Sequence, residues 1–199
     1  MRRALVISLL LSVFVNASDT IQGSKIDTIL GSSDALNIYD ERLQFLDSKS
    51  PMDLAYNSKV QPFIDSYLGK NKRLISRMQG LKKLYFPLFE QQLDKYNLPL
   101  EFKYLAIVES ALNPKAKSGS GATGLWQFMY LTGKEYGLEV TSYIDDRQDP
   151  LKSTQAACEY FLKLYDMFGD WNLVLAAYNG GPGYLQIKIN SVGSYDFWE

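Results

Sequence analysis

The segment LEFKYLAIVESALNP, residues 100–114, carries a helical pattern with one unexpected member. Its apolar residues Phe102, Leu105 and Ala106 stand at i, i+3 and i+4, the spacing that lines one face of an α-helix. The next position on that face, i+7, is Glu109. The pattern predicts a helix over residues 100–111 that ends before Pro114 and carries a carboxylate on its inward side.

A carboxylate on an inward helix face is suited to acid catalysis. Burial removes water from the charged form and raises the pKa of a carboxyl group. A carboxyl whose pKa is raised to about 6 can hold a proton at neutral pH and donate it to a leaving oxygen. Alternatively, Glu109 lies at the helix end and turns outward to water, without a chemical role. This segment by itself leaves both interpretations open.

Helical patterns from about residue 50 onward predict a mainly α fold with little or no sheet. The expected runs, besides 100–111, cover residues 50–69, 71–96, 124–137, 150–168 and 171–179. Ser50 and Asp149 each precede a proline suited to the first helical position, and Asp170 is placed to cap the last run. We expect Pro87 to divide the run at 71–96, and the GGPG at 180–183 to end the last run.

The N-terminus has the layout of a secretory signal peptide. Arg2 and Arg3 precede an apolar run at 4–15, and the small Ala17 marks the expected cleavage site. A membrane anchor is the alternative, but the run is short of the roughly 20 residues that span a bilayer. We therefore divide the chain into a signal peptide at 1–17, an N-terminal arm at 18–49 and one main domain at 50–199.

The C-terminal residues SYDFWE end in two large aromatic side chains, Phe197 and Trp198. A terminus of this kind exposes apolar surface unless it is tied down. We expect that the domain is cut short at this end.

The composition excludes several classes of site. The sequence has no histidine, which excludes Ser-His-Asp and Cys-His catalysis and His-ligated zinc. The single cysteine, Cys158, cannot form an internal disulfide and lies in an apolar repeat that predicts a buried thiol. Lys and Arg number 21 against 22 Asp and Glu, with no basic tract of the kind that binds nucleic acid. We expect no nucleic-acid partner.

A glycine-rich loop, SGSGATG at 118–124, follows the first helix. Such a loop lets backbone approach a ligand closely, and we expect it to expose N–H groups at the start of the next helix. It is not a phosphate-binding loop, because Leu125 stands where that motif has lysine. Trp126 and Gln127 follow, and an aromatic face beside an amide suits a sugar ring. The alternative is that Trp126 belongs to the core.

A third motif, AAYNGG at 176–181, combines small residues with Tyr178 and Asn179. The small residues permit close helix packing, and the two polar residues stand at a helix end where side chains can leave the core. The alternative is an ordinary asparagine near a helix C-terminus.

The three motifs in this order resemble the lytic murein transglycosylases with a soluble-transglycosylase (goose-lysozyme-like) catalytic domain. That family has Glu-Ser, then S-x-x-G-A-x-G-L-x-Q, then A-Y-N, which here are residues 109–110, 118–127 and 177–179. The segments YIDDRQDPLKST and FGDWNLVLAAYNGG resemble its D-type branch. The resemblance covers about residues 60–199 and implies a lysozyme-like fold of the α+β superfamily with little or no sheet.

The resemblance also implies a function, with peptidoglycan glycan strands as the substrate and partner. Glu109 would protonate the glycosidic oxygen between N-acetylmuramic acid and N-acetylglucosamine, then take the proton of the muramic C6 hydroxyl, giving a 1,6-anhydro product. No metal or organic cofactor is implied. The expected location is the periplasm or the outer-membrane-associated cell envelope. The supporting residues implied by the family motif are Ser110 beside the acid, Ser118 and Gln127 on the sugar, and Tyr178 and Asn179 positioning Glu109 or the N-acetyl group.

The other acidic residues are poor partners for a two-carboxylate mechanism. Glu101 lies about 12 Å from Glu109 along a helix axis. Asp149 and Asp170 are expected helix caps, and the Asp145–Asp146 pair is expected to be a solvated turn. A lysozyme-type hydrolase and a non-catalytic glycan-binding module remain alternatives.

Two departures from the family pattern stand out. Tyr130 occupies a usual proline position, at the start of a helix. Family members also continue past DFWE into an E-T-x-x-Y-V segment that lines the cleft, and often into wall-binding repeats. We expect a shortened chain.

Overall fold

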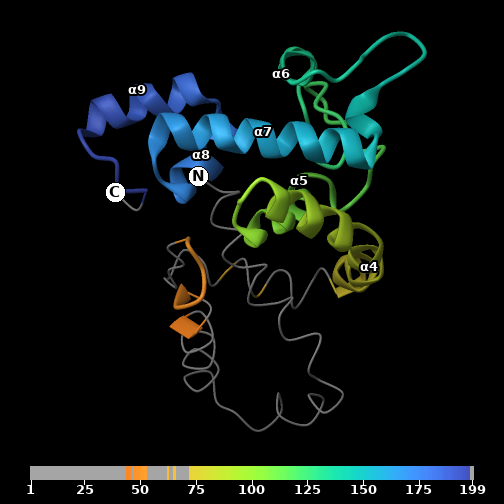
Figure 1. Ribbon diagram of the computed structural model, residues 1–199, viewed down its shortest axis with the longest axis horizontal. Coiled ribbons are helices and arrows are strands. Elements are labelled where there is room, and N and C mark those ends of the chain that lie inside the picture. Colours follow the sequence, from red (N-terminus) through yellow and green to blue (C-terminus); the bar gives the residue numbers. More distant parts are fainter. Residues whose placement is uncertain (1–43, 46, 53–61, 63–64, 66–71, 198–199) are drawn as a thin grey trace, which may run out of the picture.

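The computed structural model describes residues 44–45, 47–52, 62, 65 and 72–197. The expected signal peptide, and most of the expected arm and of the run at 50–69, lie outside these residues. From residue 72 onward most of the described chain is helical, with longer non-helical segments between α5 and α6 and between α6 and η3 (Figure 1). They are α4 (Lys72–Lys95), the 3-10 helix η2 (Leu100–Tyr104), α5 (Leu105–Ser110), α6 (Tyr130–Glu135), the 3-10 helix η3 (Asp146–Gln148), α7 (Pro150–Phe168), α8 (Trp171–Gly180) and α9 (Pro182–Val192).

The described part contains isolated β-bridges but no strand, which confirms the mainly α prediction. The bridges pair Lys117 with Thr123, Thr123 with Phe128, and Val140 with Asp145. Among the described helices, none combines the length and the apolar character needed to cross a membrane.

Helix α4 runs without interruption past Pro87, so the predicted division at this residue is wrong. Pro87 is exposed, while Phe86 and Phe89 on either side of it are buried in the core. A proline in a helix interior removes one hydrogen bond. Here the packing of the apolar face on both sides of Pro87 holds the helix together, as tertiary contacts commonly do.

The segment at 100–111 is helical, but it is not one helix. Residues 100–104 form the tighter η2, and α5 then ends at Ser110 with Ala111 and Leu112 in the left-handed region, at φ 50° and 59°. Phe102, which the pattern placed inward, is fully buried, and Tyr104 meets the Phe86 ring of α4 edge to face at 5.4 Å. Packing against α4 therefore coincides with the tighter winding of the first turn.

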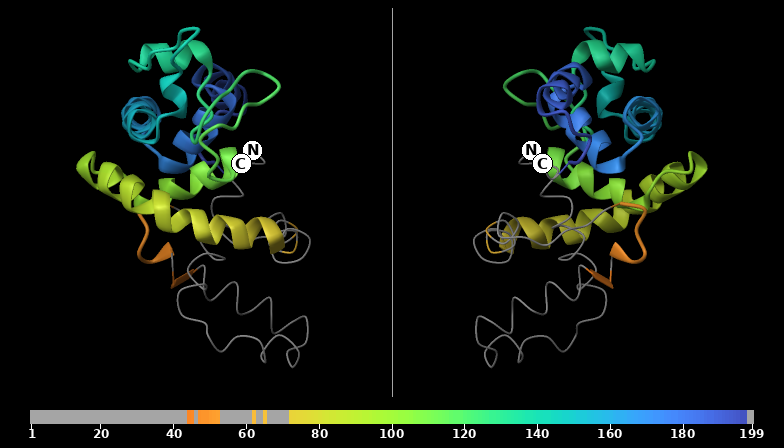
Figure 2. Two further views of the ribbon diagram at one scale, coloured as in Figure 1. Left: turned by 90° about the vertical axis from the view of Figure 1, so that its right-hand side faces the viewer. Right: turned by 90° about the vertical axis from the view of Figure 1, so that its left-hand side faces the viewer.

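Helices α7 and α8 begin where the sequence predicts. The Asp149 side chain accepts a hydrogen bond from the Lys152 N–H at 2.8 Å, and Asp170 accepts one from the Leu173 N–H at 2.8 Å. These two predicted N-caps are thus confirmed, whereas the third, at Ser50, is wrong because residues 51–52 are not helical. Helix α7 crosses α4 and packs against it. Figure 1 shows α4 nearly along its axis and α7 from the side, whereas Figure 2 shows α4 from the side and α7 nearly along its axis.

Helix α9 was not predicted. The GGPG segment ends α8 as expected, but Gly181, at φ 88°, turns the chain and Pro182 then opens a new helix. Proline at the first helical position after a glycine was the available signal.

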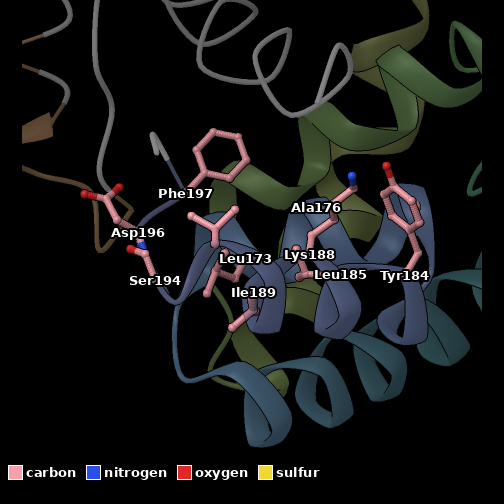
Figure 3. A pocket seen from close by; sticks show the side chains of 11 residues that line it. Leu173, Ala176, Tyr184, Leu185, Lys188, Ile189, Ser194, Asp196 and Phe197 are labelled. Carbon is pink, nitrogen blue, oxygen red and sulfur yellow. The ribbon is translucent and has the colours of Figure 1, made fainter.

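An apolar pocket of about 180 Å³ lies between α8, α9 and the segment after α9 (Figure 3). In Figure 3 the side chains of Leu173 and Phe197 lie at one end of this pocket and Tyr184 lies at the other. Phe197 is half-buried and packs against the core. Of the two terminal aromatic residues, Phe197 is therefore tied down, and Trp198 lies outside the described residues.

Candidate active site

Glu109 is the penultimate residue of α5 and its side chain is half-buried. The Glu109 side chain is therefore less buried than the helical pattern predicted, because α5 ends one residue later. Tyr178 approaches from α8. The pKa of the Tyr178 hydroxyl is raised well above its ordinary value, chiefly by burial and next by the charge of Glu109. The charge of Glu109 thus acts on the Tyr178 hydroxyl, although the two residues are 69 positions apart in the sequence (178 − 109).

Tyr178 also fixes the backbone of the segment that follows the glycine-rich loop. Its hydroxyl donates a hydrogen bond to the Trp126 carbonyl oxygen at 2.6 Å. A neutral phenol can donate this bond, and burial keeps the phenol neutral. One side chain of α8 thus contacts both the surroundings of Glu109 and the residue before Gln127.

Ser110 links the end of α5 to the same segment. Its Oγ lies 2.8 Å from the Ala106 carbonyl oxygen and 2.9 Å from the Leu125 carbonyl oxygen, so its hydroxyl can donate to either. The residue after Glu109 is therefore tied to the residue before Trp126. This contact fixes the distance between the acid and the loop.

The glycine-rich loop does not present its N–H groups as predicted. The Ala122 N–H donates to the Ser118 hydroxyl oxygen at 3.0 Å, and the Gly121 N–H donates to the Ser118 carbonyl at 3.0 Å. The Gly124 N–H donates to the Ala116 carbonyl at 2.9 Å. These N–H groups therefore form hydrogen bonds that close the loop, because compact turns pair their backbone donors internally. Ser118 therefore organises the loop besides standing half-buried in the candidate site.

No helix begins at residue 124, so the prediction of a helix over 124–137 is wrong in its first part. Residues 124–127 form a turn with Gly124 at φ 89° and Gln127 at φ 52°, and α6 begins only at Tyr130. The Gln127 amide nitrogen donates to the carbonyl oxygens of Ala116 at 3.2 Å and Gly124 at 2.9 Å. These bonds leave the amide oxygen of Gln127 as its acceptor toward a ligand.

Trp126 belongs to the core, which confirms the alternative interpretation of this residue, and it offers no stacking surface for a sugar. The side chain is fully buried, and its indole N–H donates to the Thr154 hydroxyl oxygen at 2.9 Å. The ring centroid lies 5.1 Å from that of Phe89 and 5.8 Å from that of Phe161. The turn at 124–127 sends Trp126 inward, whereas Gln127 stays half-buried.

Asn179, the last of the predicted site residues, follows Tyr178 near the C-terminal end of α8 and is half-buried. The structure thus joins Glu109, Ser110, Gln127 and Tyr178 through α5, the turn and α8. Ser118 is connected to the turn through the closed loop, and Asn179 adjoins Tyr178 along the chain.

Asp145 and Asp146 do not form a solvated turn, which corrects the prediction. Asp146 is buried, and its carboxylate accepts bonds from the Lys152 ammonium at 2.9 Å and the Glu139 N–H at 3.1 Å. Asp145 accepts two bonds from the Arg147 guanidinium, at 2.8 and 2.7 Å, and a third from the Arg147 backbone N–H at 3.2 Å. These bonds hold the pKa of both carboxyls below the ordinary range for Asp, with Lys152 as the main cause for Asp146 and Arg147 for Asp145.

Arg147 is the residue near this site that the sequence analysis missed. It is 6% exposed, although arginine is almost never buried unless paired. The D-D-R spacing was the available signal, since it places an arginine two residues from a carboxylate. In the part of the chain with described positions, no group of three or more His, Cys, Asp or Glu side chains is arranged to hold a metal ion.

Comparison with known proteins places these features in a family. The family model described as the transglycosylase SLT domain matches residues 87–199. Membrane-bound lytic murein transglycosylase D of Escherichia coli (strain K12) is 38% identical over 159 residues, which cover 77% of this chain and 35% of that protein. Soluble lytic murein transglycosylase of the same strain is 33% identical over 119 residues, covering 56% of this chain and 18% of that protein. Peptidoglycan transglycosylase gp16 of Escherichia phage T7 is 34% identical over 117 residues, covering 56% and 9%.

The matched residues include α5, the glycine-rich loop, α7 and α8. The chain spans about a third of the length of the transglycosylase D that it matches, 35%. Because the family model matches more than half of its residues, this chain belongs to the transglycosylase SLT domain family.

Proposed function

We propose that the protein is a lytic transglycosylase that cleaves the β-1,4 bond between N-acetylmuramic acid and N-acetylglucosamine in peptidoglycan. Its product is a strand that ends in 1,6-anhydromuramic acid. The family membership supports the reaction class. The observation that carries the proposal to individual residues is that Ser110, next to Glu109 on α5, and Tyr178 on α8 both bond to the turn at 124–127.

In this proposal Glu109 acts first as an acid and then as a base. The protonated carboxyl gives its proton to the glycosidic oxygen, and the bond from that oxygen to C1 of the muramic residue breaks. The carboxylate then removes the proton of the muramic C6 hydroxyl, whose oxygen bonds to C1. Glu109 ends the cycle protonated, and the leaving sugar carries a free 4-hydroxyl, so no water is consumed.

The supporting residues hold this acid and the sugar. Ser110, bonded to the turn, fixes the end of α5. Ser118 and Gln127 bind the sugar, Gln127 through its amide oxygen. Tyr178 and Asn179 orient Glu109 or the N-acetyl group. Asp145, Asp146, Asp149 and Asp170 all hold structural hydrogen bonds, which supports a mechanism with one acidic residue.

The proposed location is the periplasm or the surrounding cell envelope, where the substrate lies. The names of the relatives support this location and substrate. Transglycosylase D is named as membrane-bound, and all three names refer to murein or peptidoglycan. The signal peptide at 1–17 and the catalytic domain at 50–199 are part of the same proposal.

Digestion of purified peptidoglycan tests the reaction. Mass analysis of the soluble muropeptides should find anhydro ends for the wild-type chain. Replacing Glu109 by Gln removes the acid while it preserves the shape, so Glu109→Gln should reduce the release of these ends by about 10²–10⁴-fold, the usual contribution of a general acid. Far-UV circular dichroism should show an unchanged fold.

Glu101→Gln is the matched control, since it changes a half-buried glutamate of the neighbouring η2. This variant should keep full activity. Full activity of Glu109→Gln would overturn the assignment of the acid. Reducing ends in place of anhydro ends would identify a hydrolase. A complete lack of products from the wild-type chain would support the alternative interpretation, a non-catalytic glycan-binding module.

A further inference from the structure

Arg147 lies in η3, outside the motifs that carry the proposed chemistry, and its side chain contacts both ends of the segment 121–128. One guanidinium nitrogen, Nη1, donates to the Gly121 carbonyl oxygen at 3.1 Å and to the Phe128 carbonyl oxygen at 3.3 Å. The two carbonyls stand seven residues apart (128 − 121). A single charged group therefore fixes the span of this segment.

Asp145 holds the other side of the same guanidinium. The Arg147 Nε donates to one carboxylate oxygen of Asp145 at 2.8 Å and Nη2 donates to the other at 2.7 Å. Paired, parallel bonds of this kind fix the plane of the guanidinium group as well as its position. Since Arg147 is buried and Asp145 compensates its charge, the Nη1 atom has one defined direction, toward the two carbonyls.

The packing around Arg147 leaves little freedom for another arrangement. Its Cγ and Cδ atoms lie against Gly133 of α6, where an added Cβ would come within 3.3 and 3.2 Å of them. Its backbone carbonyl lies against Gly124, and a Cβ at Gly124 would overlap that oxygen. The main chain and the side chain of Arg147 thus both contact the segment that contains Gln127.

We propose that Arg147, oriented by Asp145, is a positioning residue that sets the geometry of the sugar-binding loop. It holds the segment 121–128, which contains Gln127 and whose Gly121 and Ala122 N–H groups bond to Ser118, so that the Gln127 amide oxygen and the Ser118 hydroxyl face the glycan together. Arg147 itself touches no substrate in this proposal. The inference rests on the proposed function, because it takes Ser118 and Gln127 as the residues that bind the sugar.

The proposal requires an arginine at this position. The guanidinium presents five donors in a fixed fork, whereas a lysine ammonium is a point charge with three. Lysine can retain the charge pairing with Asp145, but it cannot form the paired bonds and reach both loop carbonyls at once. Arg147→Lys therefore keeps the positive charge but removes the geometry of the guanidinium bonds. The isosteric Asp145→Asn keeps Arg147 but removes the carboxylate that fixes the orientation of its guanidinium.

Lys152→Gln is the matched control. Lys152 also pairs with a carboxylate of the same region, Asp146, but it lies on α7 and its ammonium bonds to Asp146 rather than to the loop. Its side chain is 55% exposed, so replacing it should leave the packing around the segment 121–128 unchanged. The control variant removes an ion pair without releasing the segment 121–128.

The test measures hydrogen exchange and steady-state kinetics on the full chain. Arg147→Lys and Asp145→Asn should accelerate exchange at the amides of 121–128 and leave those of α7 and α8 unchanged. With soluble, uncrosslinked peptidoglycan strands, they should raise KM about tenfold or more, with a smaller change in kcat, because the loop is misplaced while the acid is intact. Lys152→Gln should match the wild type in both measurements.

Two results would overturn the proposal. In the first, exchange at 121–128 and KM in the two variants equal those of Lys152→Gln. In the second, exchange rises equally throughout all helices and KM follows global stability, as a purely structural role predicts. A wild-type chain that releases no anhydro ends contradicts the proposed function instead. In that case, unchanged loop exchange in Asp145→Asn still rejects the positioning by Arg147, and accelerated exchange supports it.

Discussion

At the scale of single residues, the turn at 124–127 depends on a backbone conformation that few side chains adopt. Gly124 has φ 89°, a value that L-residues reach only with strain. It also has no room for a side chain, because the Arg147 carbonyl occupies the place of its Cβ. Gly121 has the same φ of 89° but open space around it. The two glycines thus separate backbone strain from steric overlap.

We predict that Gly124→Ala destabilises the protein more than Gly121→Ala. The strained φ alone should cost Gly121→Ala about 1–2 kcal/mol. Gly124→Ala adds the overlap with the Arg147 backbone, about 1–3 kcal/mol, so its total should be about 2–5 kcal/mol. Urea unfolding followed by tryptophan fluorescence measures both. Equal losses in the two variants would mean that the backbone at Arg147 moves away without cost.

The sequence predicts the residue types of the site better than their orientations. Glu109, Ser110 and Tyr178 come together as the motifs imply, although Glu109 is only half-buried. Trp126 and Gln127 are adjacent, yet one enters the core and the other does not. That difference depends on Thr154, 28 residues away, and on the left-handed backbone at Gln127, neither of which a local pattern reveals.

At the scale of elements, local signals predicted α7 and α8 because their ends are determined locally. An aspartate cap, a proline at the first position of α7 and Gly169 after it are all visible in the sequence. The segment at 100–111 and the turn at 124–127 differ from prediction because packing against other elements determines their shape. The burial of Asp146 was missed because its partner, Lys152, lies on the next helix.

The segment that precedes α7 should make stability depend on acid pH. Hydrogen bonds from Arg147 and Lys152 lower the pKa of Asp145 and Asp146, respectively, in the folded state. A lowered folded pKa means that the ionised carboxylates stabilise the protein above the unfolded pKa, about 4. This contribution is lost as the pH falls through the lower, folded values. We therefore predict that the free energy of unfolding decreases below about pH 4 through these two groups.

Urea unfolding between pH 7 and pH 2 tests this prediction. The double variant Asp145→Asn and Asp146→Asn lacks both titrating groups, so its stability at pH 7 should be lower and its decline in acid shallower than in the wild type. The acidic residues elsewhere are the same in both proteins and act as the internal control. Parallel curves for the two proteins would contradict the prediction.

At the scale of the whole molecule, α7 packs against both α4 and α8, the helix that carries Tyr178. Cys158 of α7 is fully buried. The charge of Lys95, at the end of α4, acts to lower the pKa of the Cys158 thiol. Cys158 in turn contributes to the raised pKa of the Tyr178 hydroxyl on α8. The helix that carries Tyr178 is therefore held by packing on α7, the helix in which Cys158 is buried. Protection of this thiol reports the assembly of α4, α7 and α8.

We predict that Cys158 reacts with a thiol reagent only when this assembly opens. Burial, and next the charge of Glu159, raises the pKa of the thiol to about 12, so little reactive thiolate exists at pH 8. The native chain should react at least about 10³-fold more slowly than the urea-unfolded chain, in keeping with the small open fraction of a folded domain. Absorbance of the released reagent measures both rates.

A matched thiol at an exposed position completes this test. Ser142 is exposed in the segment before η3, so Ser142→Cys should provide one thiol that reacts at once and leave Cys158 slow. Rapid reaction of Cys158 in the native chain would show that α4 and α8 do not stay packed on α7. If Cys158 reacts equally slowly in the wild type and in Glu109→Gln, the packing of α4, α7 and α8 is intact in the variant. The loss of activity in Glu109→Gln then arises from the missing acid and not from a loosened fold.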